Sequence, residues 1–503
     1  MLACVRTAAV FGIDAALVQV EVDVTFGLPS FTMVGLPDAS VRESRDRVRS
    51  AIRNSGLDFP PHRIIVNLAP ADVRKAGSSF DLPIALGVLA AAGQITRRNI
   101  EDVLLLGELS LDGGIQAARG VLSVAAAARR ERYRALLLPH PNRAEAEVVE
   151  GLELYPVRSL EEAVHALNAP DTFTAAPPLA PAPTTVSAAL AGEGDFSDVH
   201  GQTMARRALE IAAAGGHNVL MIGPPGAGKT MMARRVAGIL PPLSFDEALE
   251  ATSIHSVAGL LPPGTRLLPS RPFRAPHHTI SDVALVGGGQ YPRPGEISLA
   301  HHGVLFLDEM PEFSRHVLEV LRQPLEEGCV RIARAARTAV FPARFMLIGA
   351  MNPCPCGYLG DPAKACRCSP QQVARYASRL SGPLRDRIDL TVPVAALSAR
   401  ELQEAPQGEV SAPIRERVVA ARVRQRARDG VLNARLQGKA LRERAAFDEE
   451  ARRLVARAIA KLHLSARGYD RVLRVARTVA DLDGDDAVSA AHIGEALQFR
   501  GDS

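Results

Sequence analysis

The chain has 503 residues, 47% of them hydrophobic, which is enough for two to four domains with sizeable cores. It has no run of 18 apolar residues and no basic signal peptide, and its six cysteines are too few for a disulfide scaffold, so we expect a soluble, cytoplasmic protein without a membrane partner. The net charge of +4 hides an asymmetry, because residues 400–478 carry 19 basic and 10 acidic side chains. This balance of +9 indicates a polyanion partner or a solvated helical face.

Residues 1–168 alternate short strands with helices, as in an α/β domain. Alternating apolar and polar residues are typical of half-buried strands, whereas longer apolar or alanine-rich stretches are typical of helices. The expected elements are strands at 17–25, 64–68 and 135–139, a hairpin at 104–114, and helices at 79–92 and 121–132.

The stretch 107–129, which begins Gly-Glu-Leu-Ser-Leu-Asp-Gly-Gly, resembles the Lon protease domain, whose fold is ribosomal S5 domain 2-like. Lon proteases use a serine–lysine dyad. The lysine position falls on Leu122, which cannot act as a base, and residues 77–82 replace the serine motif. Ser79 has no activating neighbour in sequence, so we expect it to begin a helix. The resemblance therefore implies a protease-like fold without protease chemistry.

Residues 169–195 are rich in proline and alanine and lack periodicity. This composition predicts an extended, semi-rigid linker. A further domain is expected to open at 195–202.

A phosphate-binding P-loop, G-x-x-x-x-G-K-[ST], lies between an apolar strand-like run at 218–222 and a helical stretch at 231–240. Its residues are Gly223, Pro224, Pro225, Gly226, Ala227, Gly228, Lys229 and Thr230. The glycines let backbone N–H groups close around phosphates, and the helix N-terminus favours negative charge. We expect ATP here, with Lys229 on the β- and γ-phosphates and Thr230 on Mg²⁺. A chance glycine turn before a helix is the alternative.

A second nucleotide-binding element, the Walker B motif, is an apolar run at 303–307 followed by two carboxylates. We expect Asp308 to hold Mg²⁺, directly or through water, and Glu309 to orient and polarise the attacking water. A strand ending in solvent would have the same pattern, but the P-loop upstream favours the catalytic interpretation. The 79 residues from Lys229 to Asp308 predict an inserted segment at about 257–289.

The next stretch predicts a helix at 317–327 and a hairpin at 330–341, with Arg331, Arg334 and Arg337 at or near the hairpin tip. A strand at 344–352 then ends in Asn352, which is similar to the sensor 1 residue of AAA+ ATPases. That resemblance implies that Asn352 helps to position the lytic water.

Four of the six cysteines fall within fifteen residues, as C-x-C, nine residues, and C-x-C. They are Cys354, Cys356, Cys366 and Cys368. Four thiolates suffice for a closed tetrahedral Zn²⁺ site, although each pair is tighter than the usual C-x₂-C. Four free thiols in a loop are the alternative.

The stretch 384–390 is similar to the L-L-x-R-[FI]-D motif of magnesium chelatase ATPases and MCM helicases, where the arginine is a finger. Its position in the motif favours Arg387 as the finger, and Arg385 is the alternative. Further on, the family's sensor 2 arginine aligns best with Arg467, while Arg471 and Arg474 share its helix face and are expected to contact DNA or solvent.

These features together resemble the ComM/YifB family of magnesium-chelatase-like AAA+ ATPases. Three phrases are specific to it, at 271–278, 294–302 and 352–357. The resemblance implies an α/β chain with a Lon-protease-like domain at 1–168, an AAA+ core at 196–396 that binds adenine near 195–202, and a helical lid at 397–503.

The same resemblance implies a homo-hexameric ring that hydrolyses ATP and moves along single-stranded or branched DNA. For ComM the implied role is branch migration during natural transformation. A magnesium chelatase motor subunit and a Lon-like protease are the alternatives, and Leu122 argues against the protease. His277 and His278 have no role that the sequence suggests.

Overall fold

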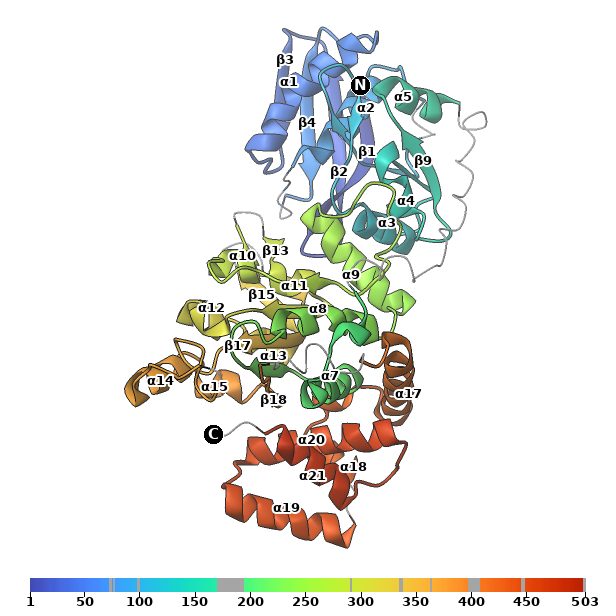
Figure 1. Cartoon of the computed structure of the whole chain (residues 1–503). Coiled ribbons are helices and arrows are strands. Elements are labelled where there is room, and N and C mark those ends of the chain that lie inside the picture. The colour runs from blue at the N-terminus through green and yellow to red at the C-terminus, as the bar shows by residue number, and fades with distance from the viewer. Residues whose placement is uncertain are drawn as a thin grey trace.

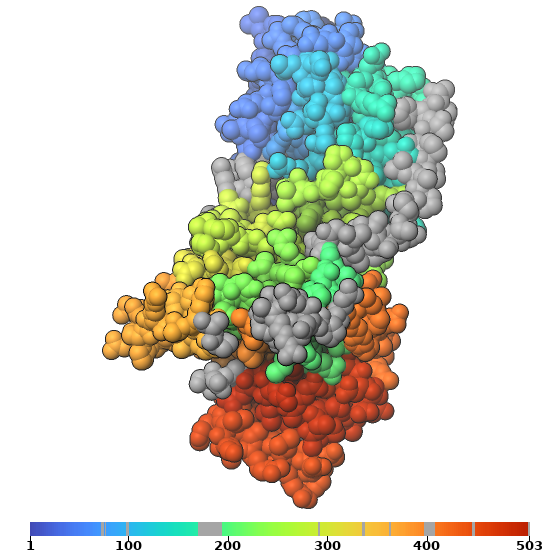
Figure 2. All heavy atoms as spheres, viewed as in Figure 1, coloured from blue at the N-terminus to red at the C-terminus, as the bar shows by residue number. Residues whose placement is uncertain are grey.

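In the computed structural model, the described residues are 1–71, 75, 77–96, 100–169, 194–289, 292–333, 338–361, 364–396, 408–444 and 448–500. Figure 1 shows three regions in a row: an N-terminal α/β region, a central α/β region and a C-terminal helical region. The space-filling view in Figure 2 shows the same elongated order, from blue through green and yellow to red. Most of the expected linker, 170–193, lies outside the described residues.

Seven described strands of the N-terminal region form a mixed sheet in the order β3-β4-β2-β1-β5-β8-β9. Helix α2 is buried along its whole length, because its sequence is apolar on every side. The strands are β1 Leu2–Phe11, β2 Asp14–Thr25, β3 Ser30–Val34, β4 Arg63–Ala69, β5 Val103–Leu105, β8 Ala135–Pro139 and β9 Glu153–Val157, with a separate hairpin of β6 Glu108–Leu109 and β7 Ile115–Gln116. The helices are α1 Ala39–Asn54, α2 Asp81–Ala91, α3 Val121–Arg130, α4 Arg143–Ala146 and α5 Leu160–Asn168.

The central region is built on a five-stranded sheet of described strands in the order β11-β14-β17-β10-β18, and every pairing in it is parallel. The strands are β11 Phe273–Arg274, β14 Val304–Leu307, β17 Met346–Met351, β10 Val219–Ile222 and β18 Leu390–Pro393. Two hairpins, β12 Gly287–Gly288 with β13 Arg293–Pro294 and β15 Cys329–Ala333 with β16 Thr338–Pro342, stand apart from the sheet. The helices are α7 Thr203–Gly215, α8 Lys229–Ile239, α9 Phe245–Ala258, α10 Asp282–Val286, α11 Glu296–Leu299, α12 Arg315–Glu319, α13 Arg322–Glu327, α14 Pro370–Ala377 and α15 Gly382–Arg385.

The C-terminal region is helical and shares a hydrophobic core with the central sheet. That core joins Val219 of β10 to Val479 and Ile493 of the helical region. Buried polar contacts add to it, since Arg422 Nε donates to the carbonyl oxygen of Ala213 at 2.8 Å. The helices are α17 Ser411–Asp429, α18 Gly438–Arg444, α19 Glu449–Leu462, α20 Ala466–Asp483 and α21 Ala490–Gln498.

The N-terminal region contacts the central region through α9 and through the β1–β2 turn. The buried carboxylate of Glu145 accepts hydrogen bonds from Ser256 Oγ at the end of α9 and from the backbone N–H of Leu122. Phe11 at the end of β1 and Ile13 of the turn pack against a hydrophobic cluster that includes Val330 and Phe341 of the β15–β16 hairpin. None of the described helices is both long and apolar enough to cross a membrane.

Most expected elements are confirmed, and two differ. The helix expected at 317–327 is two short helices, α12 and α13, because Pro324 has no N–H to donate to the carbonyl of Val320. The hairpin expected at 104–114 comprises only β6 and β7, since the fully buried residues 103–105 enter the main sheet as β5.

Candidate ATP site

The P-loop connects the end of β10 to the start of α8. Gly226 and Gly228 have φ angles of 79° and 84°, in the left-handed region that glycine adopts without steric cost. At Gly223 a Cβ would lie 2.1 Å from the carbonyl oxygen of Val394, the residue after β18. The loop therefore passes this neighbouring backbone too closely for any residue with a side chain. The sequence thus forms the compact turn that a phosphate cradle requires.

Lys229 points into this turn. Its Nζ donates to the carbonyl oxygens of Gly223 at 2.6 Å and Pro224 at 2.9 Å, and to Asn352 Oδ1 at 3.2 Å. Burial lowers the pKa of Lys229. Asn352 reaches the lysine because β17, which it follows, lies beside β10 in the sheet. The P-loop lysine and the predicted sensor asparagine are therefore in direct contact.

Thr230 and Asp308 also meet, because Thr230 Oγ1 donates to Asp308 Oδ2 at 2.6 Å. A hydroxyl and a carboxylate oxygen are ligands that Mg²⁺ prefers. Glu309 follows with a left-handed backbone, φ 49°, and its N–H donates to Asp308 Oδ1 at 2.9 Å. The side chain of Glu309 is exposed, which leaves its carboxylate free to contact water or a ligand.

His278 is a site residue that the sequence analysis left without a role. Its Nδ1 lies 3.7 Å from Glu309 Oε2. It follows β11, which pairs with β14, and side chains after parallel neighbouring strands meet at the same edge of a sheet. The two residues are 31 positions apart in sequence, so only the pairing of β11 with β14 could have predicted that they meet.

The four clustered cysteines converge as expected. Cys354 Sγ lies 3.4 Å from Cys356 Sγ and 3.6 Å from Cys366 Sγ, and the four sulfur atoms, with Cys368, all lie within 4.8 Å of one another. A tetrahedral zinc with bonds of about 2.3 Å separates its sulfurs by about 3.8 Å, so the donor set fits Zn²⁺. The loop packs on the P-loop, where a Cβ at Gly357 would lie 2.6 Å from Pro225 Cδ.

A second cluster, Glu250 with His301 and His302, does not fit a metal. Both histidine Nε2 atoms lie 2.9 Å from Glu250 Oε2. His301 Nδ1 accepts the backbone N–H of Arg344 at 2.9 Å, so the proton of a neutral ring sits on Nε2. A protonated Nε2 donates to Glu250 and cannot bind a cation. The cluster is a structural hydrogen-bond network.

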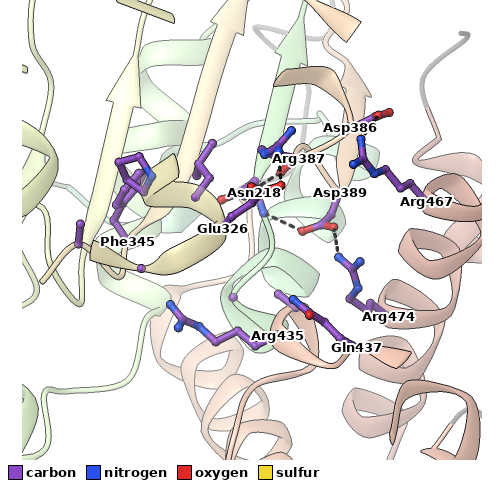
Figure 3. Close-up of a pocket in the computed structure, with 16 residues that line it drawn as sticks. Asn218, Glu326, Phe345, Asp386, Arg387, Asp389, Arg435, Gln437, Arg467 and Arg474 are labelled. Atoms are coloured by element: carbon purple, nitrogen blue, oxygen red, sulfur yellow. Dashed lines mark hydrogen bonds and ion pairs between the residues drawn. The ribbon is translucent and has the colours of Figure 1, made fainter. Parts of the chain in front are cut away.

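A cavity of about 530 Å³ lies between the central and C-terminal regions (Figure 3). Arginines line it, and three of them pair with carboxylates: Arg387 with Glu326, Arg467 with Asp386 at 3.2 Å, and Arg474 with Asp389 at 3.3 Å.

This cavity is at the opposite end of the sheet from the P-loop. Asn218, just before β10, donates from Nδ2 to the carbonyl oxygen of Arg387 at 2.8 Å, whereas the P-loop follows the other end of β10. Arg387 and Arg467 are thus gathered together, away from the Lys229 of their own chain.

The other arginines of this stretch face inward. Arg385 Nη2 donates to the carbonyl oxygen of Ala377 at 2.5 Å, and Arg471 Nη1 donates to the carbonyl oxygens of Arg385 and Ile388. Arg471 and Arg474 therefore attach α20 to the 385–389 segment, rather than facing DNA or solvent alone.

Of the hairpin arginines, Arg331 lies within β15. Its side chain is exposed, and its Nε lies 3.2 Å from Glu327 Oε2. Arg334 and Arg337 lie outside the described residues. The hairpin itself is confirmed, with Arg331 opposite Val340.

Three family models match the chain. They are described as "Magnesium chelatase, subunit ChlI" over residues 195–402, "Subunit ChlI of Mg-chelatase" over residues 20–142, and "Magnesium chelatase, subunit ChlI C-terminal" over residues 408–500. The matches cover all three regions of the structure.

Curated relatives agree with these models. The chain is 45% identical to the YifB protein of Salmonella typhimurium over 507 residues, or 99% of this chain and 97% of that protein. It is also 45% identical to competence protein ComM of Haemophilus influenzae over 504 residues, again 99% and 97%. The magnesium-chelatase 38 kDa subunit of Cereibacter sphaeroides is 24% identical over 323 residues, 59% of this chain and 88% of that subunit.

The parallel sheet, its P-loop and the carboxylates beside it define a magnesium-chelatase-like AAA+ ATPase. The chain belongs to the ComM/YifB family of these proteins.

Proposed function

We propose that the chain is an ATP-driven DNA helicase or translocase that works as a homo-hexamer and promotes branch migration of recombination intermediates. The observation that carries the ATPase part is the convergence of Lys229, Thr230, Asp308 and Asn352 from three neighbouring strands. The relative from Haemophilus influenzae is called a competence protein, which points to DNA taken up during natural transformation.

In this proposal the residues divide the work of hydrolysis. Backbone N–H groups of the P-loop and Lys229 bind the phosphates of ATP, and Thr230 and Asp308 would hold Mg²⁺. The ion supplies charge neutralisation on the phosphate oxygens. Glu309 orients the attacking water. Asn352 accepts a hydrogen bond from Lys229 and helps to position the same water.

The positions of two arginines support the proposed ring. Arg387 and Arg467 line a cavity at the end of the sheet opposite their own P-loop. An arginine stabilises the transition state only where it contacts the transferred phosphoryl group. We therefore assign both residues to the ATP of a neighbouring subunit, with Arg387 as the finger.

The DNA surface is assigned to side chains that are not already used inside the fold. Much of the positive charge of the helical region is paired internally, as for Arg428 with Asp481 and Arg417 with Glu210. Helix α19 lies on the outer edge of the lid (Figure 1). Its side chains Arg452, Arg453, Arg457 and Lys461 are exposed, and the ion pairs of Arg452 and Arg453 are with the exposed Glu449 of the same helix. These residues and the β15–β16 hairpin are the two proposed phosphate contacts.

We further propose that residues 1–168 form a Lon-protease-like domain without protease activity, joined by the 169–195 linker to the ATPase core at 196–396 and the lid at 397–503. Leu122, at the position of the Lon lysine, is buried in α3, and its N–H is bound by Glu145. Ser78 donates its hydroxyl hydrogen to Glu108, and Ser79 lies within a short 3-10 helix, Ser78–Phe80. Among the described residues, the Ser79 hydroxyl has no hydrogen bond to a histidine, lysine or carboxylate that could act as a base.

The test is the ATPase rate of the purified protein with and without single-stranded and branched DNA, at low and moderate salt. We expect stimulation by both DNAs that falls with salt through counterion release, together with strand displacement or branch migration. Lys229→Ala is the control for contaminating ATPases. A rate that ignores DNA at both salts, without measurable DNA binding, would favour the second candidate, a magnesium chelatase-type motor acting on a partner protein.

A further inference from the structure

Both terminal nitrogens of the Arg387 guanidinium are bound within its own chain. Its Nη2 forms an ion pair with the carboxylate of Glu326, and its Nη1 donates to the carbonyl oxygen of Pro383. The third nitrogen, Nε, is buried without a hydrogen-bond partner among the described residues. The side chain is only 12% exposed. In this position both Nη atoms already have acceptors within the chain, so neither is available to a phosphate.

Glu326, in contrast, is 57% exposed and comes from the last turn of α13 at the wall of the cavity, as Figure 3 shows. Its carboxylate can return to water at low cost when the arginine leaves. Asp389 differs, because it is 6% exposed and also accepts hydrogen bonds from His217 and Asn218. The Arg474–Asp389 pair is therefore part of the fold, whereas the Arg387–Glu326 pair is able to exchange partners.

We propose that Glu326 is a positioning residue that holds Arg387 retracted until the γ-phosphate of a neighbouring subunit's ATP replaces it. This inference rests on the proposed ATPase ring. A phosphate offers more charge and more acceptor oxygens than one carboxylate, and a guanidinium binds it through two parallel N–H donors. The cavity beside Arg387 provides the space in which the side chain swings out.

This arrangement makes a directional prediction. The Arg387–Glu326 ion pair stabilises the free enzyme, and it must break before the finger contacts ATP. Removing this ion pair therefore lowers the activation free energy of hydrolysis, measured from free enzyme and free ATP. Partly exposed ion pairs are weak, and their loss corresponds to a change of about two- to five-fold. Glu326→Gln should therefore raise kcat/KM for ATP by about that factor, whereas a residue that only supports the fold would lower it.

The experiment uses the full-length protein without DNA, at a concentration where rings are verified by light scattering. ATP titrations compare the wild type, Glu326→Gln, Arg387→Ala and the double variant. Glu443→Gln, which removes an exposed carboxylate from an ion pair with Lys439 on the lid, is the matched control and should match the wild type. Glu326→Gln should exceed the wild type, and the double variant should equal Arg387→Ala, because the glutamate acts only through that arginine.

The outcomes separate this inference from the function beneath it. If the wild type does not hydrolyse ATP, or Arg387→Ala hydrolyses it normally, the proposed function or its finger is wrong. If Arg387→Ala is impaired but Glu326→Gln equals or falls below the wild type, the retraction by Glu326 is wrong. An effect of Glu326→Gln that persists in the Arg387→Ala background overturns it as well.

Discussion

Thr230 Oγ1 donates a 2.6 Å hydrogen bond to Asp308 Oδ2 across 78 residues of sequence. The contact places the first residue after the P-loop lysine beside the first carboxylate of the Walker B element. Both side chains reach this point because the strands that precede them end at the same edge of one parallel sheet. This edge of the sheet is the candidate ATP site.

The two halves of this site should fail in different ways. Lys229→Ala should abolish ATP binding, because the lysine is the buried cation among the phosphate contacts. Glu309→Gln should bind ATP normally but hydrolyse it roughly 10²–10⁴-fold more slowly, as expected for loss of a general base. Binding of a fluorescent ATP analogue and phosphate release measure the two effects. Near-normal turnover by Glu309→Gln would refute its role.

Mixed rings test the assignment of Arg387 to a neighbouring subunit. Arg387→Ala alone should lose roughly 10³–10⁵ in rate if it is the finger. Mixing it with Lys229→Ala protein should restore part of the activity, because some interfaces then combine an intact finger with an intact P-loop. Mixing Lys229→Ala protein with a second variant that carries both Lys229→Ala and Arg387→Ala should restore none, because no subunit then has an intact P-loop. No recovery in rings shown to contain both single variants would mean that Arg387 acts within its own subunit.

The cysteine cluster should hold one zinc per chain. Zinc binding and folding of the loop are coupled, so Cys356→Ser should lose the metal and loosen the loop. Since Gly357 packs against Pro225 of the P-loop, metal loss should also weaken binding of an ATP analogue. Mass spectrometry of metals on freshly purified, reduced protein measures the zinc content per chain. Glu250→Gln is the control and should still contain one zinc per chain. Zinc-free protein that binds the analogue normally would contradict this prediction.

Acid should destabilise the Glu250 network. Burial, with the adjacent His301, lowers the pKa of His302 to about 4, so the folded state keeps this ring neutral while the unfolded state protonates it near pH 6.5. The stabilisation is complete above pH 6.5 and declines as the pH falls towards 4, by about 1 kcal/mol at pH 5.5. Hydrogen bonds from His301 and His302 lower the pKa of Glu250 to about 2, which adds a loss between pH 4.5 and 2.

Urea unfolding at pH 7.5 and 5.5 checks this prediction. His302→Gln should reduce the difference in unfolding free energy between the two pH values. The part of this difference that remains in His302→Gln should come from His301 and His255, whose pKa values are also lowered by burial. An unchanged difference in His302→Gln would show that His302 does not titrate in this window.

The two proposed DNA surfaces can be compared directly. Arg331→Ala on the hairpin and the pair Arg452→Ala with Arg453→Ala on α19 each remove exposed positive charge. If both surfaces contact phosphates, each change should weaken DNA binding and reduce its salt dependence, with basal ATP hydrolysis unchanged. Arg130→Ala, an exposed arginine of the N-terminal region, is the control. A salt dependence equal to that of the control would remove the surface concerned from the proposal.

The sequence alone determined the features that depend on nearby residues. The P-loop requires only a strand, glycines with left-handed φ angles and a helix start, all within about twenty residues, and the structure has them. The Walker B strand, the hairpin at 330–341 and the convergence of the four cysteines were predicted for the same reason. The prediction of one continuous helix at 317–327 was wrong, because Pro324 interrupts the helical hydrogen bonding there.

Only the tertiary structure decided which distant residues meet. Asn352 touches Lys229, and His278 approaches Glu309, because of the order β11-β14-β17-β10, which spacing along the chain does not specify. Arg385 faces inward and contacts α14, whereas Arg387 pairs with Glu326 of α13. This distinction depends on how α15 and the residues after it pack against α13, α14 and α20. Local patterns establish the chemistry available to each side chain, whereas sheet order and helix packing establish its partner.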